Sequence, residues 1–441
     1  MRTVPAAADE KHQLHAHDDP FRILPGTVYT EIRHLTDQEP AAVPRTQAGA
    51  ADSPGESGGQ PGHRGCSLPG IYVYLGGKYM KALVLNDIAD IRLCDVPIPE
   101  PGRGEVLLKV EACGICSSDY NRIYIDGAHQ MPLIPGHEFV GTVTELGPGV
   151  REELLGKRAA VYPLLPCRQC DSCMREEYEL CGYYDYFGTR RDGGFAEYVS
   201  VPVFNLVLIP DEMKSLDAVI CEPAAVCSHA VRLSGLQHGD IAVVIGTGTM
   251  AYLTALIAKI RGAGKEIVIG HSTEKVKRIS KTCDHVVNAK IWDPEEAVRT
   301  LTVGHMADVV FECVGSSEAL GYAIEVSGEQ TRIVAVGEPD GAITIEQNLY
   351  WKILRKEIQF RGLWNSGYNS GKNDWTRIIA YIREGLIDPG EIVTNAFPLE
   401  KYEEAIGMLR SGEDHMKVVF VPAENEEPEA LQNDQDKEDT E

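Results

Sequence analysis

The sequence predicts an α/β protein with a smaller domain rich in β-strands and a second domain built on a doubly wound parallel sheet. Up to about residue 223, short β-forming runs such as Glu105–Glu111 and Gly141–Leu146 are punctuated by Pro and Gly. From about residue 224 the pattern changes to strand, turn and helix. At 441 residues, of which 43% are hydrophobic and 24% charged, the chain is long enough for more than one core.

The second domain is expected to open with a buried strand, a glycine-containing turn and a helix, at 241–245, 246–251 and 251–261. Further strands are predicted at 266–269, 307–313 and 332–336, and amphipathic helices at 375–383 and 402–410.

Gly246 and Gly248 lie in the turn between the first strand and its helix. Glycines at this point let the backbone approach a pyrophosphate, and the helix amino terminus supplies N–H donors to its charge. Ala251 replaces a third glycine, which mainly affects helix–strand packing. A lone glycine motif is often accidental, but the strand before it and the helix after it predict a dinucleotide site.

Four cysteines, Cys167, Cys170, Cys173 and Cys181, form a C-x2-C-x2-C-x7-C cluster. Thiolates at this spacing wrap around one tetrahedral zinc and cannot all pair as disulfides without strain. Because four sulfurs close the coordination shell, we predict a structural zinc without a catalytic role. The alternative is four unrelated buried cysteines.

A second group of metal-binding residue types comprises Cys116, His137 and Glu138, with Glu222 further along the chain. Three protein ligands plus an exchangeable oxygen are the composition of a catalytic zinc site. Each residue alone is more often a packed core residue or a solvated charge. Together they predict a catalytic zinc and therefore two zinc ions per chain.

Around these residues the chain resembles the zinc-containing medium-chain alcohol and polyol dehydrogenases. The segment Gly136-His137-Glu138-x2-Gly141-x5-Gly147 is similar to that superfamily's zinc signature, and residues 113–139, 188–198 and 353–357 are similar to the galactitol-1-phosphate 5-dehydrogenases within it. The resemblance covers roughly residues 80–422. It implies a GroES-like catalytic domain at 80–223 and 366–422 and a Rossmann domain at 224–365.

The resemblance implies a zinc-dependent oxidoreductase that transfers hydride between a nicotinamide dinucleotide and a secondary hydroxyl of a polyol or sugar-alcohol phosphate. Cys116, His137 and Glu222 would hold the catalytic zinc, Glu138 would be a neighbouring or exchanging ligand, and Ser118 would take the hydroxyl proton. Glu222 in place of a third thiolate favours a polyol over a simple alcohol.

A phosphorylated substrate would need cations near the site, and Arg122, Arg190 and Lys352 are candidates. Asn121 stands where several relatives carry a relay histidine. Sorbitol, a diol or threonine is the alternative substrate. A catalytically retired scaffold that binds dinucleotide is the alternative of another class.

The resemblance places Gly270 where NAD enzymes carry the carboxylate that binds the ribose 2′-OH. Without that carboxylate a 2′-phosphate is not repelled, and His271, Ser272 and Lys275 offer donors to it. Val336 completes the predicted cofactor residues. We therefore expect NADP to be favoured over NAD. Alternatively, these are helix-surface residues and NAD binds without its usual acid.

Composition limits the partners. The formal net charge of −24 argues against nucleic acid, which is bound through clustered Lys and Arg. Twelve cysteines without a secretory signal indicate a reducing, cytoplasmic location. Glycines interrupt the one long apolar run, 241–260, so we expect no membrane span. We expect a homo-oligomer that acts on a small molecule.

Both ends of the chain differ from the middle. Residues 1–79 have little hydrophobic periodicity, which predicts a disordered extension. Met80 resembles the start of the family's chains, so we expect the natural start there. Residues 423–441 hold nine acidic residues against one lysine and are expected to be a disordered, solvated tail.

Overall fold

The computed structural model of the chain describes residues 78–339, 341–411 and 414–422. They form a largely antiparallel seven-stranded sheet and a parallel six-stranded sheet, which confirms the predicted α/β class. Residues 1–77 of the predicted extension and the predicted acidic tail lie outside the described residues.

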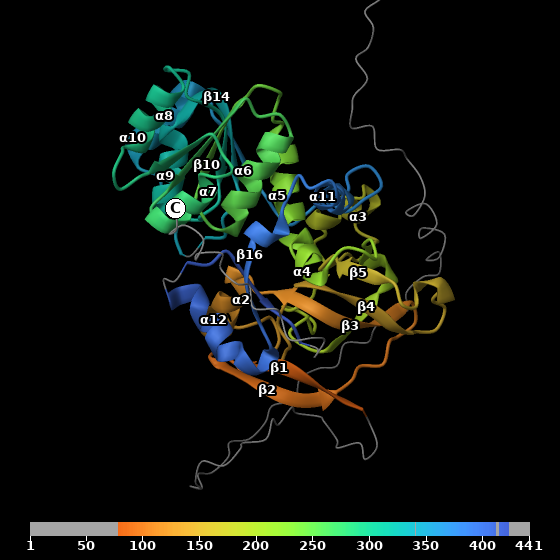
Figure 1. Cartoon of the computed structure of the whole chain (residues 1–441). Coiled ribbons are helices and arrows are strands. Elements are labelled where there is room, and N and C mark those ends of the chain that lie inside the picture. Colours follow the sequence, from red (N-terminus) through yellow and green to blue (C-terminus); the bar gives the residue numbers. More distant parts are fainter. Residues whose placement is uncertain (1–77, 340, 412–413, 423–441) are drawn as a thin grey trace, which may run out of the picture. The chain divides into compact units, whose positions relative to one another are not determined.

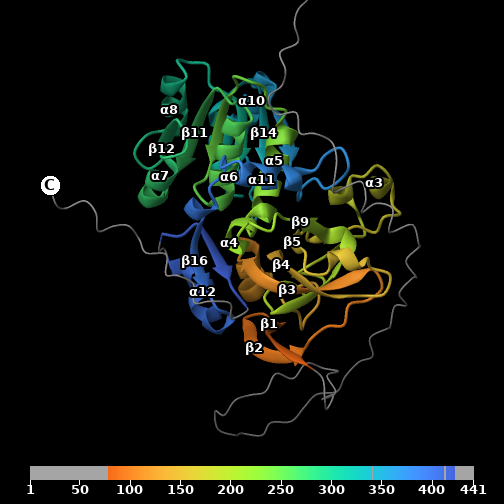
Figure 2. The same cartoon turned by 45° about the vertical axis from the view of Figure 1, so that its right-hand side comes forward.

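Strands from the first and last parts of the described chain share the seven-stranded sheet. Its members are β3 (Glu105–Gly114), β4 (Glu138–Leu146), β5 (Arg158–Val161), β8 (Tyr198–Pro202), β9 (Leu206–Leu208), β16 (Val393–Phe397) and β17 (Lys417–Phe420). Strand β3 is its centre because it pairs antiparallel with β4, β8 and β17. Figure 2 shows β3, β4, β5 and β9 in one layer. Two antiparallel pairs lie apart from it: β1 (Tyr79–Asp87) with β2 (Asp90–Pro97), and β6 (Leu164–Leu165) with β7 (Asp185–Tyr186).

Neighbouring strands of the six-stranded sheet are all parallel. They are β10 (Ile241–Ile245), β11 (Lys265–Gly270), β12 (His285–Asn288), β13 (Ala307–Glu312), β14 (Ser327–Ala335) and β15 (Gln359–Gly362). Their spatial order is β12-β11-β10-β13-β14-β15, so the chain order reverses direction between β10 and β13. In such sheets ligands bind outside the carboxyl ends of the strands near this reversal.

Helices connect the parallel strands and extend the first part of the chain. Their bounds are α2 (Ser117–Asn121), α3 (Asp171–Met174), α4 (Ser215–Ala218), α5 (Cys221–Ser234), α6 (Thr249–Ile260), α7 (Thr273–Ile279), α8 (Pro294–Leu301), α9 (Ser317–Glu325), α10 (Gln347–Lys356), α11 (Asp374–Arg383) and α12 (Tyr402–Ser411). Each strand and helix expected from the sequence overlaps an observed element, although β14 begins five residues before the predicted strand at 332–336. Several other elements were not predicted, among them β12, β15, β16, β17, α5 and α8 to α10.

Both faces of β10 are buried, which explains its continuous apolar sequence. Ala242 and Val244 pack into a core cluster with residues of α5 and α6. Val243 and Ile245, on the opposite face, pack with residues of α8 and α9. Figure 1 shows α5 and α6 on one side of this sheet and α8 and α9 on the other. The sheet is therefore doubly wound.

The last described strand returns to the first sheet. In β17, Val419 and Phe420 pair with Gly114 and Cys113 at the carboxyl end of β3. This pairing places Lys417, at the start of β17, near the residues that follow β3.

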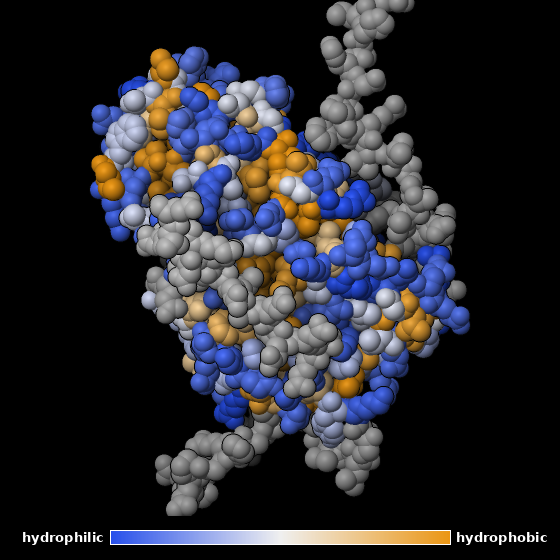
Figure 3. Space-filling view, viewed as in Figure 1, coloured by the Kyte–Doolittle hydropathy of each residue, from blue (hydrophilic) through white to orange (hydrophobic). Residues whose placement is uncertain are grey.

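No helix within the described ranges is long and apolar enough to cross a membrane. The face of the molecule in Figure 3 mixes polar and hydrophobic side chains. Exposed large hydrophobic residues such as Ile291 and Val303 occur on the surface, as is usual for folded proteins.

Candidate active site

Four thiols meet in the segment between β6 and β7. The Sγ atoms of Cys167, Cys170, Cys173 and Cys181 all lie within 4.8 Å of one another. Cys167 and Cys173 are 3.9 Å apart at sulfur, and Cys170 and Cys181 are 3.8 Å apart. All four are free thiols. The fold therefore brings together the cluster that the spacing predicts.

These separations fit one tetrahedral zinc. Zn–S bonds of about 2.3 Å place the sulfurs of such a site about 3.8 Å apart. The backbone N–H of Cys173 is the largest of several influences that lower the pKa of Cys170 to about 6, which favours the thiolate that a metal needs. With four protein sulfurs as ligands, a metal here would have no open position for a substrate.

A second set consists of Cys116, His137 and Glu138, whose ligand atoms also lie within 4.8 Å of one another. Pairing of β3 with β4 sets Gly114 opposite Glu138, and Cys116 is the N-cap of α2 directly after β3. A Cβ at Gly114 would lie 2.1 Å from Glu138 Oε2, so only glycine leaves room for this carboxylate. Thiolate, imidazole and carboxylate together fit a zinc ion with an exchangeable position.

Asp119 orients two members of this set. It is fully buried, and its Oδ2 accepts a hydrogen bond from the Cys116 backbone N–H at 3.0 Å. Its Oδ1 lies 3.3 Å from His137 Nδ1 and 2.7 Å from Arg122 Nη1. This contact leaves Nε2 of His137 for a metal. Burial lowers the pKa of His137, but the nearby Asp119 charge raises it, and the net shift is well upward.

Glu138 is paired with a lysine that sequence reasoning missed. Lys417 Nζ lies 2.7 Å from the Glu138 carboxylate, and both side chains are buried. Lys417 also donates a hydrogen bond to the carbonyl oxygen of Ile115 at 3.3 Å. A buried carboxylate without a counter-charge would be strongly destabilising, and Lys417 supplies that counter-charge beside the metal ligands.

Glu222 lies in the first turn of α5 and is buried, but it is not part of the set that meets within 4.8 Å. Burial raises the pKa of Glu222 to about 7, and the charge of His137 opposes that shift, so the two side chains interact. Ser118 is half-buried on α2. The roles of Glu222 as third ligand and of Ser118 as proton acceptor stay predictions.

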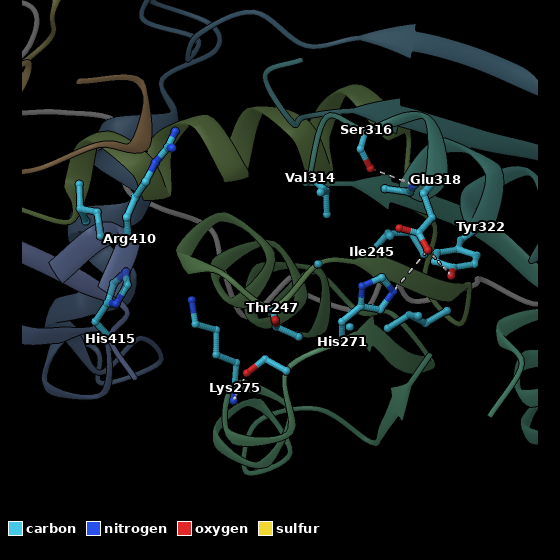
Figure 4. Close-up of a pocket in the computed structure, with 16 residues that line it drawn as sticks. Ile245, Thr247, His271, Lys275, Val314, Ser316, Glu318, Tyr322, Arg410 and His415 are labelled. Carbon is cyan, nitrogen blue, oxygen red and sulfur yellow. Dashed lines mark hydrogen bonds and ion pairs between the residues drawn. The ribbon is translucent and has the colours of Figure 1, made fainter. Parts of the chain in front are cut away.

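A cavity of about 480 Å³ opens at the carboxyl ends of β10 and β11 (Figure 4). Five predicted cofactor residues line it: Gly246, Gly270, His271, Ser272 and Lys275. The other two, Gly248 at the N-cap of α6 and Val336 after β14, are not among its lining residues. The cavity is where an open α/β sheet binds its ligand.

Three predicted donors in this cavity differ in their other contacts. His271 Nε2 lies 3.9 Å from Glu318 Oε1, and its ring packs edge-on against Tyr322 (Figure 4). Ser272 accepts a hydrogen bond from the Lys275 backbone N–H and so caps α7. No acidic side chain in the described ranges forms an ion pair with Lys275. Lys275 is therefore the donor most available to an anion.

Two features of the cavity were not foreseen. Arg410, near the end of α12, and His415 line it, although they lie far from the glycine motif in the sequence. A Cβ at Gly270 would lie 2.2 Å from Cγ2 of Thr247. A carboxylate side chain at position 270 would therefore need a smaller side chain at position 247.

The three residues predicted to bind a phosphate group of the substrate also differ in whether they are already paired with other side chains. Lys352 forms an ion pair with Glu295 of α8 at 2.7 Å, and Arg122 is paired with Asp119. The Cζ atom of the Arg190 guanidinium lies 4.4 Å from the centroid of the Tyr184 ring. Its buried Nε has no hydrogen-bond partner among the described residues.

Aromatic rings connect Arg190 with the metal-binding set. The Tyr184 ring under Arg190 is 6.2 Å from the ring of Tyr186, measured between centroids, and 6.4 Å from that of Trp364. Tyr186 in turn lies 5.8 Å from the His137 ring. Neither Tyr184 nor Tyr186 carries a sequence signal that distinguishes it from an ordinary core tyrosine.

Family models agree with this combination of sheets and metal-binding sets. Residues 102–211 match the alcohol dehydrogenase GroES-like domain, and residues 246–384 match the zinc-binding dehydrogenase model. The protein is therefore a dehydrogenase of the zinc-binding class.

Individual relatives place it more narrowly. The chain is 29% identical over 349 residues to galactitol 1-phosphate 5-dehydrogenase of Escherichia coli (strain K12), covering 78% of this chain and 100% of that one. It is 31% identical over 353 residues to L-threonine 3-dehydrogenase of Bacillus subtilis (strain 168), covering 78% and 99%. A zinc-binding dehydrogenase of Sinorhizobium meliloti 1021, solved with NADP bound, superposes with a TM-score of 0.73 at 29% identity, covering 78% and 100%. This chain belongs to the zinc-containing medium-chain alcohol and polyol dehydrogenases, as its sequence motifs predict.

Proposed function

We propose that this chain is a zinc- and NADP-dependent dehydrogenase that oxidises a secondary hydroxyl of a sugar-alcohol phosphate of the galactitol 1-phosphate kind. In this proposal residues 80–223 and 366–422 form the catalytic domain, and residues 224–365 form the dinucleotide-binding domain. The observation that carries the substrate class is the guanidinium of Arg190, whose Nε has no hydrogen-bond partner among the described residues. Arg190 packs on Tyr184, and Tyr184 and Tyr186 form an aromatic row that leads to His137.

Two ligand sets support two zinc ions per chain. Cys116 and His137 would hold the catalytic ion, with Glu222 as third ligand and Glu138 exchanging with it, while the four-cysteine cluster would hold the structural ion. When bound, the catalytic zinc supplies positive charge that lowers the pKa of an alcohol. Ser118 would accept the hydroxyl proton, and a nicotinamide dinucleotide held by the residues that line the cavity of Figure 4 would supply the hydride acceptor.

A phosphate group would be recognised by Arg190. Its planar guanidinium is held by the Tyr184 ring and by one hydrogen bond to the Tyr184 carbonyl oxygen, which leaves further N–H donors for a phosphate. Arg122 and Lys352 are weaker candidates because both are already paired with carboxylates.

Because the relatives at about 30% identity include dehydrogenases of different substrates, the substrate needs direct measurement. We expect the zinc-loaded protein with NADP to oxidise galactitol 1-phosphate with a higher kcat/KM than galactitol, sorbitol, 2,3-butanediol or threonine. Initial rates of NADPH formation test this. A higher value for an unphosphorylated compound would contradict the phosphate assignment, and no turnover of any of them would favour a non-catalytic scaffold.

The preference for NADP is supported by the surroundings of Gly270. Position 270 itself carries no carboxylate to repel a 2′-phosphate, and Lys275 lines the same cavity. The carboxylate that does line it, Glu318, lies 3.9 Å from His271 Nε2. The structural relative with bound NADP is consistent with this choice. The homo-oligomeric state and cytoplasmic location expected from the sequence stay predictions.

Replacing Gly270 with aspartate is expected to shift the ratio of kcat/KM values towards NAD by at least about tenfold, or roughly 1.4 kcal/mol. The carboxylate would bind the 2′-OH of NAD and repel a 2′-phosphate. Since a side chain at position 270 collides with Thr247, the change is made as Thr247→Ala with Gly270→Asp. Thr247→Ala alone opens the same space without adding charge and is the matched control.

Lys275→Ala tests the same idea from the opposite direction and should weaken NADP more than NAD. If the wild-type protein strongly prefers NAD and Lys275→Ala leaves kcat/KM unchanged for both cofactors, these residues do not bind the 2′-phosphate of NADP. His271, Ser272 and Lys275 would then be ordinary residues of the α7 surface.

A further inference from the structure

Tyr186 is held beside the catalytic metal ligands by the fold of the four-cysteine segment. It lies in β7, where it pairs with Leu164 of β6, and these two short strands bracket the cysteine cluster. Its ring is half-buried and lies 5.8 Å from the ring of His137, measured between centroids. The segment that would hold one metal therefore positions a tyrosine beside the residues that would hold the other.

Asn365 fixes the direction of the hydrogen bond to this tyrosine. Its Oδ1 accepts hydrogen bonds from the backbone N–H of Ser366 at 2.7 Å and from the Ser366 hydroxyl at 3.2 Å. Its backbone carbonyl oxygen lies 2.9 Å from His229 Nδ1. With Oδ1 occupied, Nδ2 must point the other way, and it donates a hydrogen bond to the Tyr186 hydroxyl at 3.2 Å.

The Tyr186 hydroxyl thus accepts one hydrogen bond and still has its own proton to donate. Among the described residues this hydroxyl accepts the bond from Asn365 and donates none. A tyrosine hydroxyl carries its proton at neutral pH, so this one is a hydrogen-bond donor close to the metal ligands. A protonated donor without an acceptor beside a reaction site is suited to a substrate oxygen.

We propose that Tyr186 and Asn365 form a polar subsite that binds the hydroxyl next to the reacting one, and so selects vicinal diols over mono-alcohols. This inference rests on the proposed function, in which Cys116 and His137 hold the metal that activates a secondary hydroxyl. A site with a buried donor for a substrate hydroxyl discriminates against an analogue that lacks it, because the donor is then left unpaired.

Two conservative changes remove the donor in different ways. Tyr186→Phe deletes the hydroxyl and keeps the ring. Asn365→Asp keeps the shape of the side chain but replaces its amide donor with a carboxylate oxygen that would accept the tyrosine proton. Asn365 has a φ of 55°, and aspartate is one of the few residues that tolerate this left-handed conformation.

The test is calorimetric binding of 2,3-butanediol and of 2-butanol to the zinc-loaded protein saturated with NADPH or NADH, where neither alcohol can be oxidised. Both variants should weaken binding of the diol about tenfold and that of 2-butanol less than twofold. Tyr162→Phe is the matched control, because this buried tyrosine hydroxyl has no hydrogen-bond partner among the described residues. It should change neither affinity.

The subsite would be ruled out by wild-type protein that binds the diol no more tightly than 2-butanol. Equal losses for both alcohols in the two variants would also overturn it, since they would show that the pair only supports packing. Oxidation with NADP or NAD is measured separately. Absence of turnover contradicts the proposed function, whereas the binding preference still decides the role of Tyr186.

Discussion

His137→Ala is expected to lower the zinc content from two ions per chain to one and to abolish nearly all turnover, while dinucleotide still binds. The imidazole is one of the groups that meet within 4.8 Å, and without this ligand the set would lose the zinc ion whose charge lowers the pKa of an alcohol. The four-cysteine cluster does not include His137 and should keep its ion. Mass spectrometry of the native protein gives the metal content, and initial rates give kcat.

Two controls separate loss of the metal from loss of the fold. His305→Ala removes an exposed histidine and should leave both zinc ions and the activity unchanged. Cys170→Ser should remove the other ion and lower stability more than it changes the chemistry of the protein that stays folded. Retention of more than about a tenth of the wild-type kcat by His137→Ala, a barrier change under roughly 1.4 kcal/mol, would remove this site from the mechanism.

Arg190→Ala is expected to lower kcat/KM for galactitol 1-phosphate by about 10- to 100-fold, or roughly 1.4 to 2.8 kcal/mol, and to change the value for galactitol less than threefold. The buried Nε of the guanidinium has no hydrogen-bond partner among the described residues. Removing the guanidinium would remove a bidentate contact with the phosphate. The two substrates differ only in the phosphate, so their ratio isolates this contact. Steady-state rates on both substrates measure it.

Arg175→Ala provides a control of equal charge. Arg175 is an exposed residue that follows α3 in the four-cysteine segment, and it pairs with Glu177 rather than with any residue of the aromatic row. It should leave the ratio between the two substrates unchanged. If Arg190→Ala reduces both substrates equally, its role is to hold Tyr184 and not to bind phosphate.

Local sequence patterns were sufficient for the class of fold and for most of the side chains that meet in the two candidate metal-binding sets. The spacing from Cys167 to Cys181 determines that four thiols can meet within one loop, whatever the rest of the chain does. The strand at 241–245 and its glycine turn are likewise set by neighbouring residues, because hydrophobic period and glycine conformation act over a few positions. These features were predictable because their physical causes are contiguous in the chain.

Tertiary structure alone decided which side chains are available for chemistry. Lys417 and Glu138 are in contact although they are 279 residues apart in the sequence, and Asn365 and Tyr186 are 179 apart. No local sequence pattern predicts either contact. Lys352 and Arg190 look alike in the sequence, yet one is paired with a carboxylate and the other keeps an unpaired Nε. The charge and hydrogen-bonding capacity of a side chain depend on burial and on distant partners, and packing sets both.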